Sequence, residues 1–495
     1  MFLILATTFL FAVAVCHLIP LRRQTPLPPG PRPLPFVGNV FDISQTTPWK
    51  TFTKWGIEYG SVVAIKVFRA HFILINSPTH ANEILGRGSS SSSSRPNLLM
   101  AKMSGFDGLV PLLAPSEQLR QTRKYMHMAL GPDAMTKDAP ALQRRALTFA
   151  NRIVESPELL LSEDVAGGLE RIIYGATEES ESSAFTKLAE EAIDIFKSLA
   201  DPTSGWMVDV FPVLQYLPSW MPGGSFHKKA KNFREGVVGR MLDEPFRVAL
   251  ERITAGTSEP CLVSRLIPGG IENTLDEHSL CLIRNAATSA YLGGIDTSVC
   301  VAATLFLVMM LYPEAQARAQ LEIDAVTKQA RLPTLEDREA LPFIDCILKE
   351  ILRWAPPAPL VFPHIQDCDA VFDGQLIPSG STILVNTWGI CRDSKLYPDP
   401  DQFKPERFLD TSLLDPQSFT FGFGRRSCPG THLVDRSTWI TTATVLATLS
   451  VSCPVDPVTK EEKRPVPAFT EEPLRQPLPF ECRIEARVPA LLVKQ

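Results

Sequence analysis

A cysteine in a glycine-rich loop near the C-terminus is the residue best placed to do chemistry. The segment 421–430 reads FGFGRRSCPG, and residues 431–449 after it have a helical pattern. The sulfur of Cys428 is therefore expected at a helix N-terminus, where free backbone N–H groups and the helix dipole favour a thiolate. The glycines allow the backbone to lie close to a flat ligand. The complete spacing F-x-x-G-x-R-x-C-x-G is met by Phe421, Gly424, Arg426, Cys428 and Gly430.

Two glycines interrupt the middle of the longest helical pattern, in the segment Gly293-Gly294-Ile295-Asp296-Thr297. Each glycine costs about 1 kcal/mol relative to alanine inside a helix, so both need a reason. One reason is close packing against a neighbouring helix. The other, implied by the family resemblance described below, is a local opening of the helix beside the acid and alcohol that follow.

A glutamate and an arginine lie three residues apart on another predicted helix, as Glu350 and Arg353. This spacing places the two side chains on one face of the helix. Such a pair is an ordinary surface feature when it occurs alone. Here the segment Pro405-Glu406-Arg407-Phe408 follows it downstream.

Together and in this order, these motifs resemble those of the cytochrome P450 haem-thiolate monooxygenases, and the resemblance covers nearly the whole chain. It implies haem b as the cofactor, with Cys428 as the axial ligand of the haem iron, so that the thiolate favours O–O cleavage. It implies that Arg426, Arg123 and His364 contact the haem propionates. The other residues that it places at the haem are Phe421, Gly422 and Gly430.

The same resemblance assigns roles to the remaining motifs. Glu350, Arg353 and Arg407 would form a structural triad that locks the loop carrying Cys428. A buried charge network of this kind is costly to break. Asp296 and Thr297 resemble the family's catalytic acid–alcohol pair, in which the threonine donates a hydrogen bond where oxygen is activated and the aspartate relays protons from solvent.

One position departs from the family pattern: Leu119 stands where tryptophan is usual, in the W-x-x-x-R helix that ends in Arg123. An indole N–H can bond a propionate and leucine cannot. Two alternatives stay open beside a monooxygenase: a haem-thiolate isomerase or dehydratase that uses no O2, and a non-catalytic haem-binding member, at which Leu119 hints. Retention of Asp296 and Thr297 favours the monooxygenase.

The implied reaction inserts one oxygen atom from O2 into a small apolar organic substrate. The chain has no GxGxxG crossover and no Walker A motif, so it shows no means of binding its own flavin or nicotinamide. Electrons are then expected from NADPH through a separate cytochrome P450 reductase, with cytochrome b5 as a second donor. The segments 363–364, 377–380 and 397–400 resemble fungal microsomal members of secondary metabolism, similar to O-methylsterigmatocystin oxidoreductase and tryptamine 4-monooxygenase. A terpenoid substrate is favoured, and polyketides and indoles also fit.

The elements that must position these residues form a helix-rich body with a smaller β part. Alternating hydrophobicity predicts a hairpin over 61–75, and β patterns return over 372–388. Helical patterns cover 137–200, 274–312, 313–328 and 341–354. The expected fold is therefore mainly α with a small β part, which is the cytochrome P450 fold, preceded by an N-terminal transmembrane helix.

Composition supports one globular body and excludes several classes of protein. The chain has 495 residues, of which 45% are hydrophobic and 21% charged, with a net charge of −5. A disordered chain is excluded, and no basic excess indicates a nucleic-acid partner. The six serines Ser89–Ser94 are expected to form a solvated loop without function. The apolar but proline-broken segment Phe211–Gly224 is either core or a loop that dips into a membrane.

The first residues have the pattern of a membrane anchor. Residues 2–19 are nearly all apolar, and Arg22 and Arg23 follow them. The positive-inside rule then places the body in the cytosol, on the endoplasmic reticulum membrane. A cleaved signal peptide is the alternative, and the missing basic start counts against it. We expect an anchor at 1–21, a proline-rich hinge at 22–36 and a catalytic domain at 37–495.

Overall fold

Helices form most of the protein, and short strands make up a minor part. The computed structural model describes residues 25–155, 163–175, 179–200, 206–267, 275–456 and 458–492. Within these ranges the expected mainly helical body with a small β part is confirmed. The expected anchor at 1–21 and the first hinge residues lie outside the described residues, so the transmembrane helix stays a prediction.

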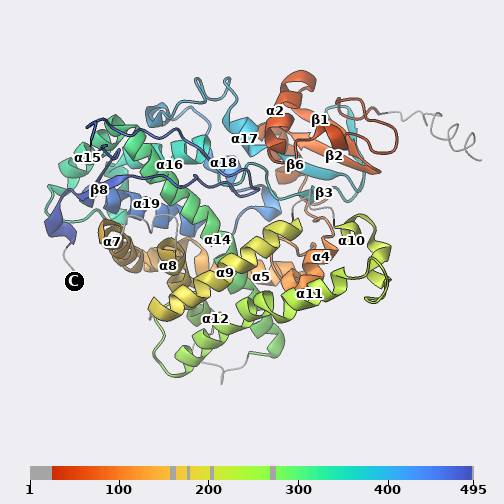
Figure 1. Cartoon of the computed structure of the whole chain (residues 1–495), viewed down its shortest axis with the longest axis horizontal. Coiled ribbons are helices and arrows are strands. Elements are labelled where there is room, and N and C mark those ends of the chain that lie inside the picture. Colours follow the sequence, from red (N-terminus) through yellow and green to blue (C-terminus); the bar gives the residue numbers. More distant parts are fainter. Residues whose placement is uncertain are drawn as a thin grey trace, which may run out of the picture.

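The longer helices account for the body of the molecule (Figure 1). They are α2 (Pro48–Tyr59), α5 (Glu117–Leu130), α7 (Ala139–Glu155), α8 (Glu163–Tyr174), α9 (Glu179–Ala200), α11 (Phe226–Glu235), α12 (Val237–Thr254), α14 (Glu277–Leu311), α15 (Pro313–Thr327), α16 (Pro342–Trp354) and α19 (Thr431–Thr448). Shorter helices are α3 (Pro78–Ala81), α4 (Leu99–Ala101), α6 (Pro132–Lys137), α10 (Met207–Val210), α13 (Leu262–Leu266), α17 (Thr387–Cys391) and α18 (Gln417–Thr420). The helices expected over 137–200, 313–328 and 341–354 are confirmed where the chain is described.

The largest sheet joins segments that are far apart in sequence. Its strands are β1 (Val62–Val67), β2 (Ala70–Ile75), β6 (Thr382–Val385) and β3 (His364–Ile365), in the order β1-β2-β6-β3. The hairpin expected over 61–75 is confirmed, with Val62 paired to Ile75. Two smaller sheets pair β4 (Ala370–Phe372) with β5 (Gln375–Ile377) and β7 (Leu449–Ser452) with β8 (Arg483–Ala486). Because β3 pairs with β6, His364 is held inside the molecule rather than on a loop.

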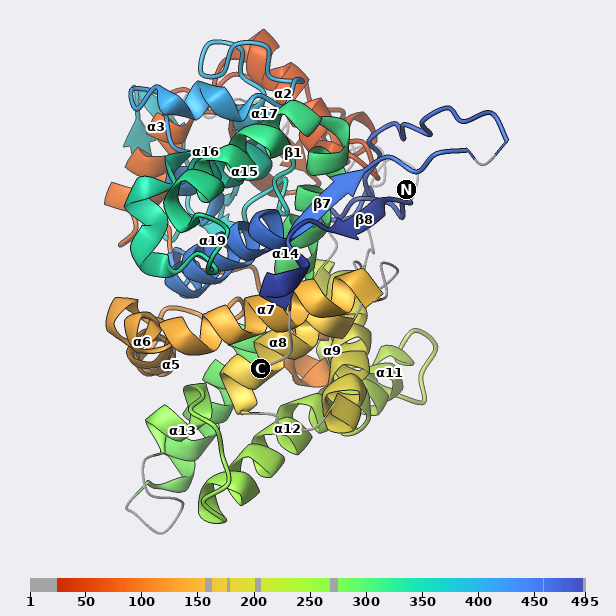
Figure 2. The ribbon, with the colours of Figure 1, turned by 90° about the vertical axis from the view of Figure 1, so that its left-hand side faces the viewer.

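The helix α14 is the central element. Its 35 residues begin after Asp276, whose side chain accepts a hydrogen bond from the Ser279 N–H, and end before Pro313, which cannot continue the helix. It contacts α5, α8 and α12 on one side and α16 and α19 on the other, so it runs between two blocks of helices (Figure 2). Among the described residues it is the one helix long and apolar enough to cross a membrane. Its burial within the protein identifies it as a core helix.

The expectation of a solvated serine loop was wrong. Ser92 and Ser93 are buried. The Ser92 hydroxyl donates to the Ile84 carbonyl at 2.8 Å, which fastens the serine run to the helical segment η2 (Asn82–Arg87). Serine hydroxyls satisfy backbone carbonyls locally, so a run of serines can enter the interior without unpaired polar groups.

The core reading of segment 211–224 was also wrong. Phe211, Val213, Tyr216 and Trp220 are 51%, 71%, 80% and 81% exposed. The segment forms a 3₁₀ turn (Pro212–Tyr216) and a loop between α10 and α11, and its prolines keep it from packing as a regular element.

Candidate active site

The cysteine loop closes on itself immediately before α19. The Cys428 N–H donates to the Phe421 carbonyl at 2.7 Å. Gly424 has φ +54°, and a Cβ there would lie 2.3 Å from the Leu85 carbonyl oxygen. Only glycine meets both conditions, so the loop can pack directly against η2. The sequence-based placement of Cys428 at the N-terminus of α19 agrees with the structure.

Cys428 is accessible although protein surrounds it. The side chain is exposed. Burial nevertheless raises the pKa of its thiol, and this effect outweighs the Gly430 N–H, Arg123 and Thr431, which lower that pKa. The helix N-terminus alone therefore does not produce the thiolate expected from the sequence. An accessible sulfur deep in the protein faces open space inside the molecule, and a bound metal ion would deprotonate it outright.

Arg123 on α5 approaches the cysteine loop from the side. Its Nη2 donates to the Ser427 carbonyl at 2.9 Å, next to Cys428. Leu119, one turn earlier on α5, is buried in the main hydrophobic core. The side chain at position 119 therefore offers apolar packing and no hydrogen bond.

Arg426 binds the segments that enclose the site. Its Nε donates to the Ser93 carbonyl at 2.7 Å and its Nη2 to the Leu113 carbonyl at 2.6 Å. Burial and then Arg123 lower the pKa of Arg426 to about 10. The guanidinium thus crosslinks the serine run and the loop before α5.

His364 is buried with one ring nitrogen unused. Its Nδ1 lies 2.7 Å from the Ser92 carbonyl oxygen, to which it donates. Its Nε2 is buried without a hydrogen-bond partner among the described residues. Burial, followed by the charges of Arg95 and Arg426, lowers the pKa of His364 to about 3. The hydrogen bond to Ser92 acts in the opposite direction and is outweighed.

Arg95 is a candidate site residue that sequence reasoning missed. Its Nη1 donates to the Phe362 and Pro363 carbonyls at 2.8 and 2.7 Å. Burial, then Arg426 and Arg123, lower its pKa to about 9. No local signal marks it, because an arginine after a serine run looks solvated.

These groups fit a haem. Arg95, Arg123 and Arg426 repel one another inside the protein, and no ion pair with a carboxylate of the described residues balances them. The bare Nε2 of His364 lies near two of them. A haem carries two propionates and an iron, which would balance the arginines and ligate the accessible Cys428. The donor set fits a haem-thiolate site.

The two glycines of α14 have different structural roles. A Cβ on Gly294 would lie 2.5 Å from the Leu169 Cδ2, so this glycine permits close packing against α8. Gly293 is exposed although most of α14 is buried, and a Cβ there would meet nothing within 4 Å. Thr297 Oγ1 donates to the Gly293 carbonyl at 3.1 Å. An open space therefore lies beside Gly293 and Thr297.

Asp296 has a partner that the sequence did not indicate. Its Oδ2 lies 2.5 Å from the Nζ of Lys197, which comes from α9. Both side chains are largely buried, with 10% and 17% exposed. The two residues are 99 positions apart, so no short motif joins them.

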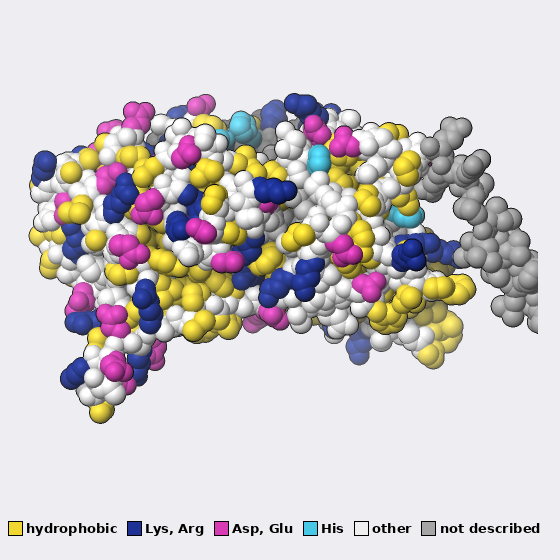
Figure 3. All heavy atoms as spheres, turned by 90° about the horizontal axis from the view of Figure 1, so that it is seen from above, with side chains coloured by type: hydrophobic (Ala, Val, Ile, Leu, Met, Phe, Trp, Pro, Cys, Tyr) yellow, Lys and Arg dark blue, Asp and Glu magenta, His cyan; other side chains and the backbone are white. Residues whose placement is uncertain are grey.

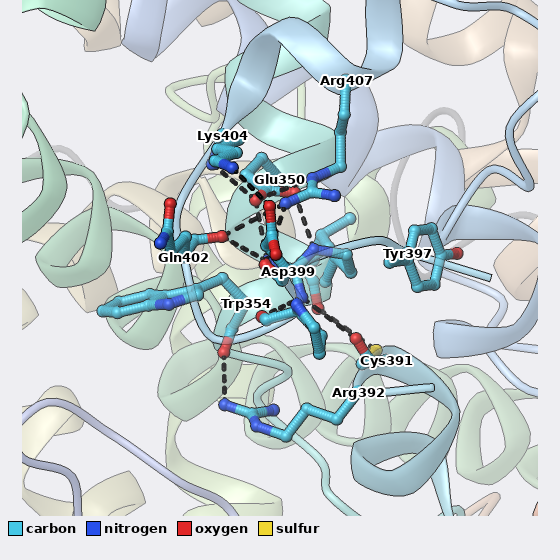
Figure 4. Close-up of polar contacts among 12 residues, drawn as sticks. Glu350, Trp354, Cys391, Arg392, Tyr397, Asp399, Gln402, Lys404 and Arg407 are labelled. Atoms are coloured by element: carbon cyan, nitrogen blue, oxygen red, sulfur yellow. Dashed lines mark hydrogen bonds and ion pairs between the residues drawn. The ribbon is translucent and has the colours of Figure 1, made fainter. Parts of the chain in front are cut away.

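Glu350 forms ion pairs with both Arg353 and Arg407. Figure 4 shows Arg407 and Lys404 beside the Glu350 carboxylate. Arg353 donates from Nε and Nη2 to the two oxygens of Glu350, both at 2.7 Å, and both side chains are fully buried. Arg407 Nε and the Lys404 N–H reach the same carboxylate at 3.2 and 2.7 Å. This geometry is bidentate, and the extra hydrogen bonds offset the desolvation of the buried pair.

The remaining donors of this network fasten the chain that leads toward Cys428. Arg353 Nη1 donates to the Pro400 carbonyl at 2.6 Å, and Arg407 Nη1 donates to the Pro398 carbonyl at 2.6 Å. The network therefore ties the segment 398–407 to α16.

Comparison with known proteins agrees with this geometry. Residues 28–478 match the family model "Cytochrome P450". The chain belongs to the cytochrome P450 family and is a cytochrome P450 monooxygenase, a class in which haem is bound through a thiolate.

Its relatives include fungal enzymes that match over nearly their whole length. Cytochrome P450 monooxygenase 208 of Postia placenta is 35% identical over 98% of this chain and 96% of its own. Tryptamine 4-monooxygenase of Psilocybe cyanescens is 32% identical over 95% of both chains. A zebrafish cytochrome P450 solved with progesterone superposes with a TM-score of 0.70 at 21% identity, covering 89% of this chain and 99% of that one. That likeness supports the fold.

Proposed function

We propose that Cys428 is the axial ligand of the haem iron and that the residues around Gly293 and Thr297 form the oxygen-side wall of the site. The observation that carries this proposal is an accessible cysteine enclosed by protein at the N-terminus of α19. Arg95, Arg123, Arg426 and His364 would hold the propionates. When bound, the haem would activate O2, from which one oxygen atom enters the substrate.

The chain's own residues would supply the protons. One oxygen atom of O2 enters the substrate and the other leaves as water, which consumes two electrons and two protons. Thr297 would hold a proton at the open space beside Gly293, where its hydroxyl already lies. Asp296, the residue before Thr297, would then return a proton from solvent to the threonine.

Reduced protein treated with CO tests the ligand. Thiolate ligation predicts the red-shifted Soret band in the parent, and Cys428→Ser should lose that band together with all oxygenase activity. The same serine replacement at Cys368, an exposed free cysteine, should change neither. A Cys428→Ser protein that kept the band would sink the assignment.

The proposed substrate is a small apolar intermediate of fungal secondary metabolism, with terpenoids favoured over polyketides and indoles. Phe106 and Leu109 pack with Leu292 of α14 in one apolar cluster, which supports an apolar substrate. The relatives support a fungal setting, and one of them is named for a tryptamine substrate. Expression with a fungal reductase, followed by product analysis on one compound of each class, separates the three.

Electrons are proposed to come from NADPH through a separate cytochrome P450 reductase, with cytochrome b5 as a second donor. Reconstitution should show no NADPH oxidation by this protein alone. Adding the reductase should start it, and adding cytochrome b5 should raise the product formed per NADPH.

The proposed location is the endoplasmic reticulum membrane, with residues 1–21 as anchor, 22–36 as hinge and the catalytic domain in the cytosol. Exposed apolar side chains support a membrane-facing end. Phe36, Phe41 and Phe68 are 79%, 77% and 48% exposed near β1 and β2, and the exposed segment after α10 lies at the same end of the long axis (Figure 1). Hydrophobic side chains gather at this right-hand end in Figure 3.

A further inference from the structure

Arg338 joins two helices through a single side chain. It belongs to the 3₁₀ helix η6 (Leu335–Ala340), which lies between α15 and α16 in the chain. Its Nε and Nη2 donate to Asp345 of α16, the shorter bond at 2.7 Å. Its Nη1 and Nη2 donate to the two carboxylate oxygens of Asp435 of α19, at 2.7 and 2.8 Å. Each carboxylate therefore meets a different edge of one guanidinium.

The link is partly buried and lies beside an aromatic ring. The side chain of Arg338 is 28% exposed, and those of Asp345 and Asp435 are both 26% exposed. The guanidinium carbon is 5.8 Å from the ring centroid of Trp439, which is buried one turn further along α19. Apolar contacts between helices have no preferred direction, whereas a bidentate bond to a carboxylate fixes distance and orientation together. The link therefore sets the position of α19 relative to α16.

Asp435 is close to the cysteine of the proposed haem site. It lies one helical turn after Thr431, the first residue of α19, and seven residues after Cys428. The Gly430 N–H hydrogen-bonds to the Cys428 sulfur. The Thr431 hydroxyl donates to the Cys428 carbonyl at 2.8 Å. The start of α19 thus holds the cysteine, and a shift of its first turn would reach the sulfur.

Both flanks of the cysteine loop are fastened to α16, which packs against α19 (Figure 2). Before the loop, Arg353 Nη1 donates to the Pro400 carbonyl and so holds the segment 398–407. After the loop, Arg338 connects Asp345 to α19. Asp345 lies in the first turn of α16 and Arg353 in its last turn, so the two attachments are separated along the helix. The cysteine loop therefore runs between two fixed points.

From this geometry we propose that Arg338 is a positioning residue for Cys428: by joining Asp345 to Asp435 it fixes the first turn of α19 and the groups there that hold the sulfur. The proposal rests on the proposed role of Cys428 as the axial ligand. Arg338 acts through α19 and not by contact with the reacting atoms. Lysine cannot replace it, because an ammonium is a single point charge and cannot bind two carboxylates along two edges.

The test compares haem-loaded full-length Arg338→Lys with Arg331→Lys, and both variants keep the positive charge. Arg331 lies in the same connection and forms the same kind of bidentate pair, with Asp337 at 2.6 and 2.8 Å, but Asp337 belongs to η6 and not to α19. In Arg338→Lys the iron–sulfur stretching frequency should shift in the resonance Raman spectrum. Its reduced CO complex should also lose the red-shifted Soret band several-fold faster on mild warming. Arg331→Lys should match the parent in both measurements.

A second variant changes only the α19 end of the link. Asp435→Asn leaves the pair of Arg338 with Asp345 in place and should cause the same spectral changes as Arg338→Lys. In the double variant the second substitution should add little, because both remove one interaction.

Far-UV circular dichroism over the same temperatures separates positioning from folding. A displaced sulfur in a folded protein loses the Soret band while the helical signal is unchanged. If Arg338→Lys has the iron–sulfur frequency of the parent and loses the band only together with the helical signal, Arg338 is a structural residue and the proposal is overturned.

The ligand assignment and the positioning role fail in different ways. If Cys428→Ser keeps the red-shifted band, the ligand assignment is wrong and the positioning role with it. If Cys428→Ser loses the band but Arg338→Lys behaves as Arg331→Lys, the ligand assignment stands and the positioning role is wrong.

Discussion

At the scale of single residues, the site depends on three arginines that form no ion pair with a carboxylate within the described ranges. Arg95, Arg123 and Arg426 share one interior region, and His364 is kept neutral beside them by burial and by their field. Such a cluster is costly to bury unless a ligand brings negative charge. Arg426 donates to two backbone carbonyls, which satisfy its N–H groups but leave its positive charge unbalanced.

Thr297→Ala should leave haem and substrate binding intact but lower the yield of product per NADPH. Without the hydroxyl that now lies beside Gly293, protons reach the oxygen more slowly and hydrogen peroxide is released instead. Peroxide per product should rise by up to roughly a hundredfold, the lower end of the range for loss of a general acid. Thr297→Ser, which keeps the hydroxyl, should restore the parent ratio. Equal peroxide from all three proteins would exclude this threonine from the relay.

Leu119→Trp should slow haem loss if position 119 faces a propionate. Leu119 is 7% exposed in the core, one turn from Arg123, and supplies no donor. An indole N–H would add a hydrogen bond to a charged group, worth about 1.5–3 kcal/mol, while overpacking costs about 1–3 kcal/mol. Haem transfer to an apo-globin measures the outcome, and Leu119→Phe controls for size without the donor. If the folded Trp variant loses haem no more slowly than the Phe variant, the indole finds no propionate.

At the scale of elements, α16 supports the structure rigidly, whereas α14 combines close packing with local open space. The bidentate pair of Glu350 and Arg353 fixes the segment 398–407 on α16, which makes α16 a rigid support. By contrast, α14 is tight at Gly294 and open at Gly293. A single helix therefore provides both packing against α8 and room for a small molecule.

Glu350→Gln should destabilise the protein without touching the site. The change leaves the Arg353 charge buried and uncompensated, which costs about 3–5 kcal/mol. Loss of the Soret band in urea should occur at a clearly lower midpoint. The control is Glu406→Gln, because the Glu406 carboxylate is half-exposed and 3.9 Å from Arg318; it should change the free energy of unfolding by about 0.5 kcal/mol or less and so barely move the midpoint. Equal midpoints for the two variants would contradict a structural role for Glu350.

At the scale of the whole molecule, exposed apolar side chains gather at one end of the long axis (Figures 1 and 3). Water-exposed aromatic residues on a proline-rich loop have no packing role, and their amphipathic rings suit the interface of a bilayer. The proposed anchor would then be assisted by the body of the protein rather than act alone.

Phe211→Ser/Trp220→Ser should weaken liposome binding of a chain that lacks residues 1–24. Both side chains are mostly exposed, so folding should be unaffected. Sedimentation with phosphatidylcholine vesicles should retain severalfold less of this double variant than of its parent. Leu321→Ser, which removes an equally exposed leucine from α15, is the matched control and should sediment as the parent does. Equal losses from both variants would mean that the loop has no special contact with lipid.

The sequence by itself determined those features that are encoded over short distances. The hairpin of β1 and β2, the long α14 with its apolar second half, and the placement of Cys428 just before α19 follow from periodicity, prolines and glycines within a few turns. The tertiary structure alone decided the rest. It brought Arg95 beside Arg426, turned the serine run inward to meet His364, and placed Lys197 against Asp296. These pairs are separated by 99 to more than 300 residues, and no local pattern records which surfaces meet when helices and strands pack. The exposure of Trp220 was undecided for the same reason: an apolar residue is compatible with core or surface until its neighbours are in place.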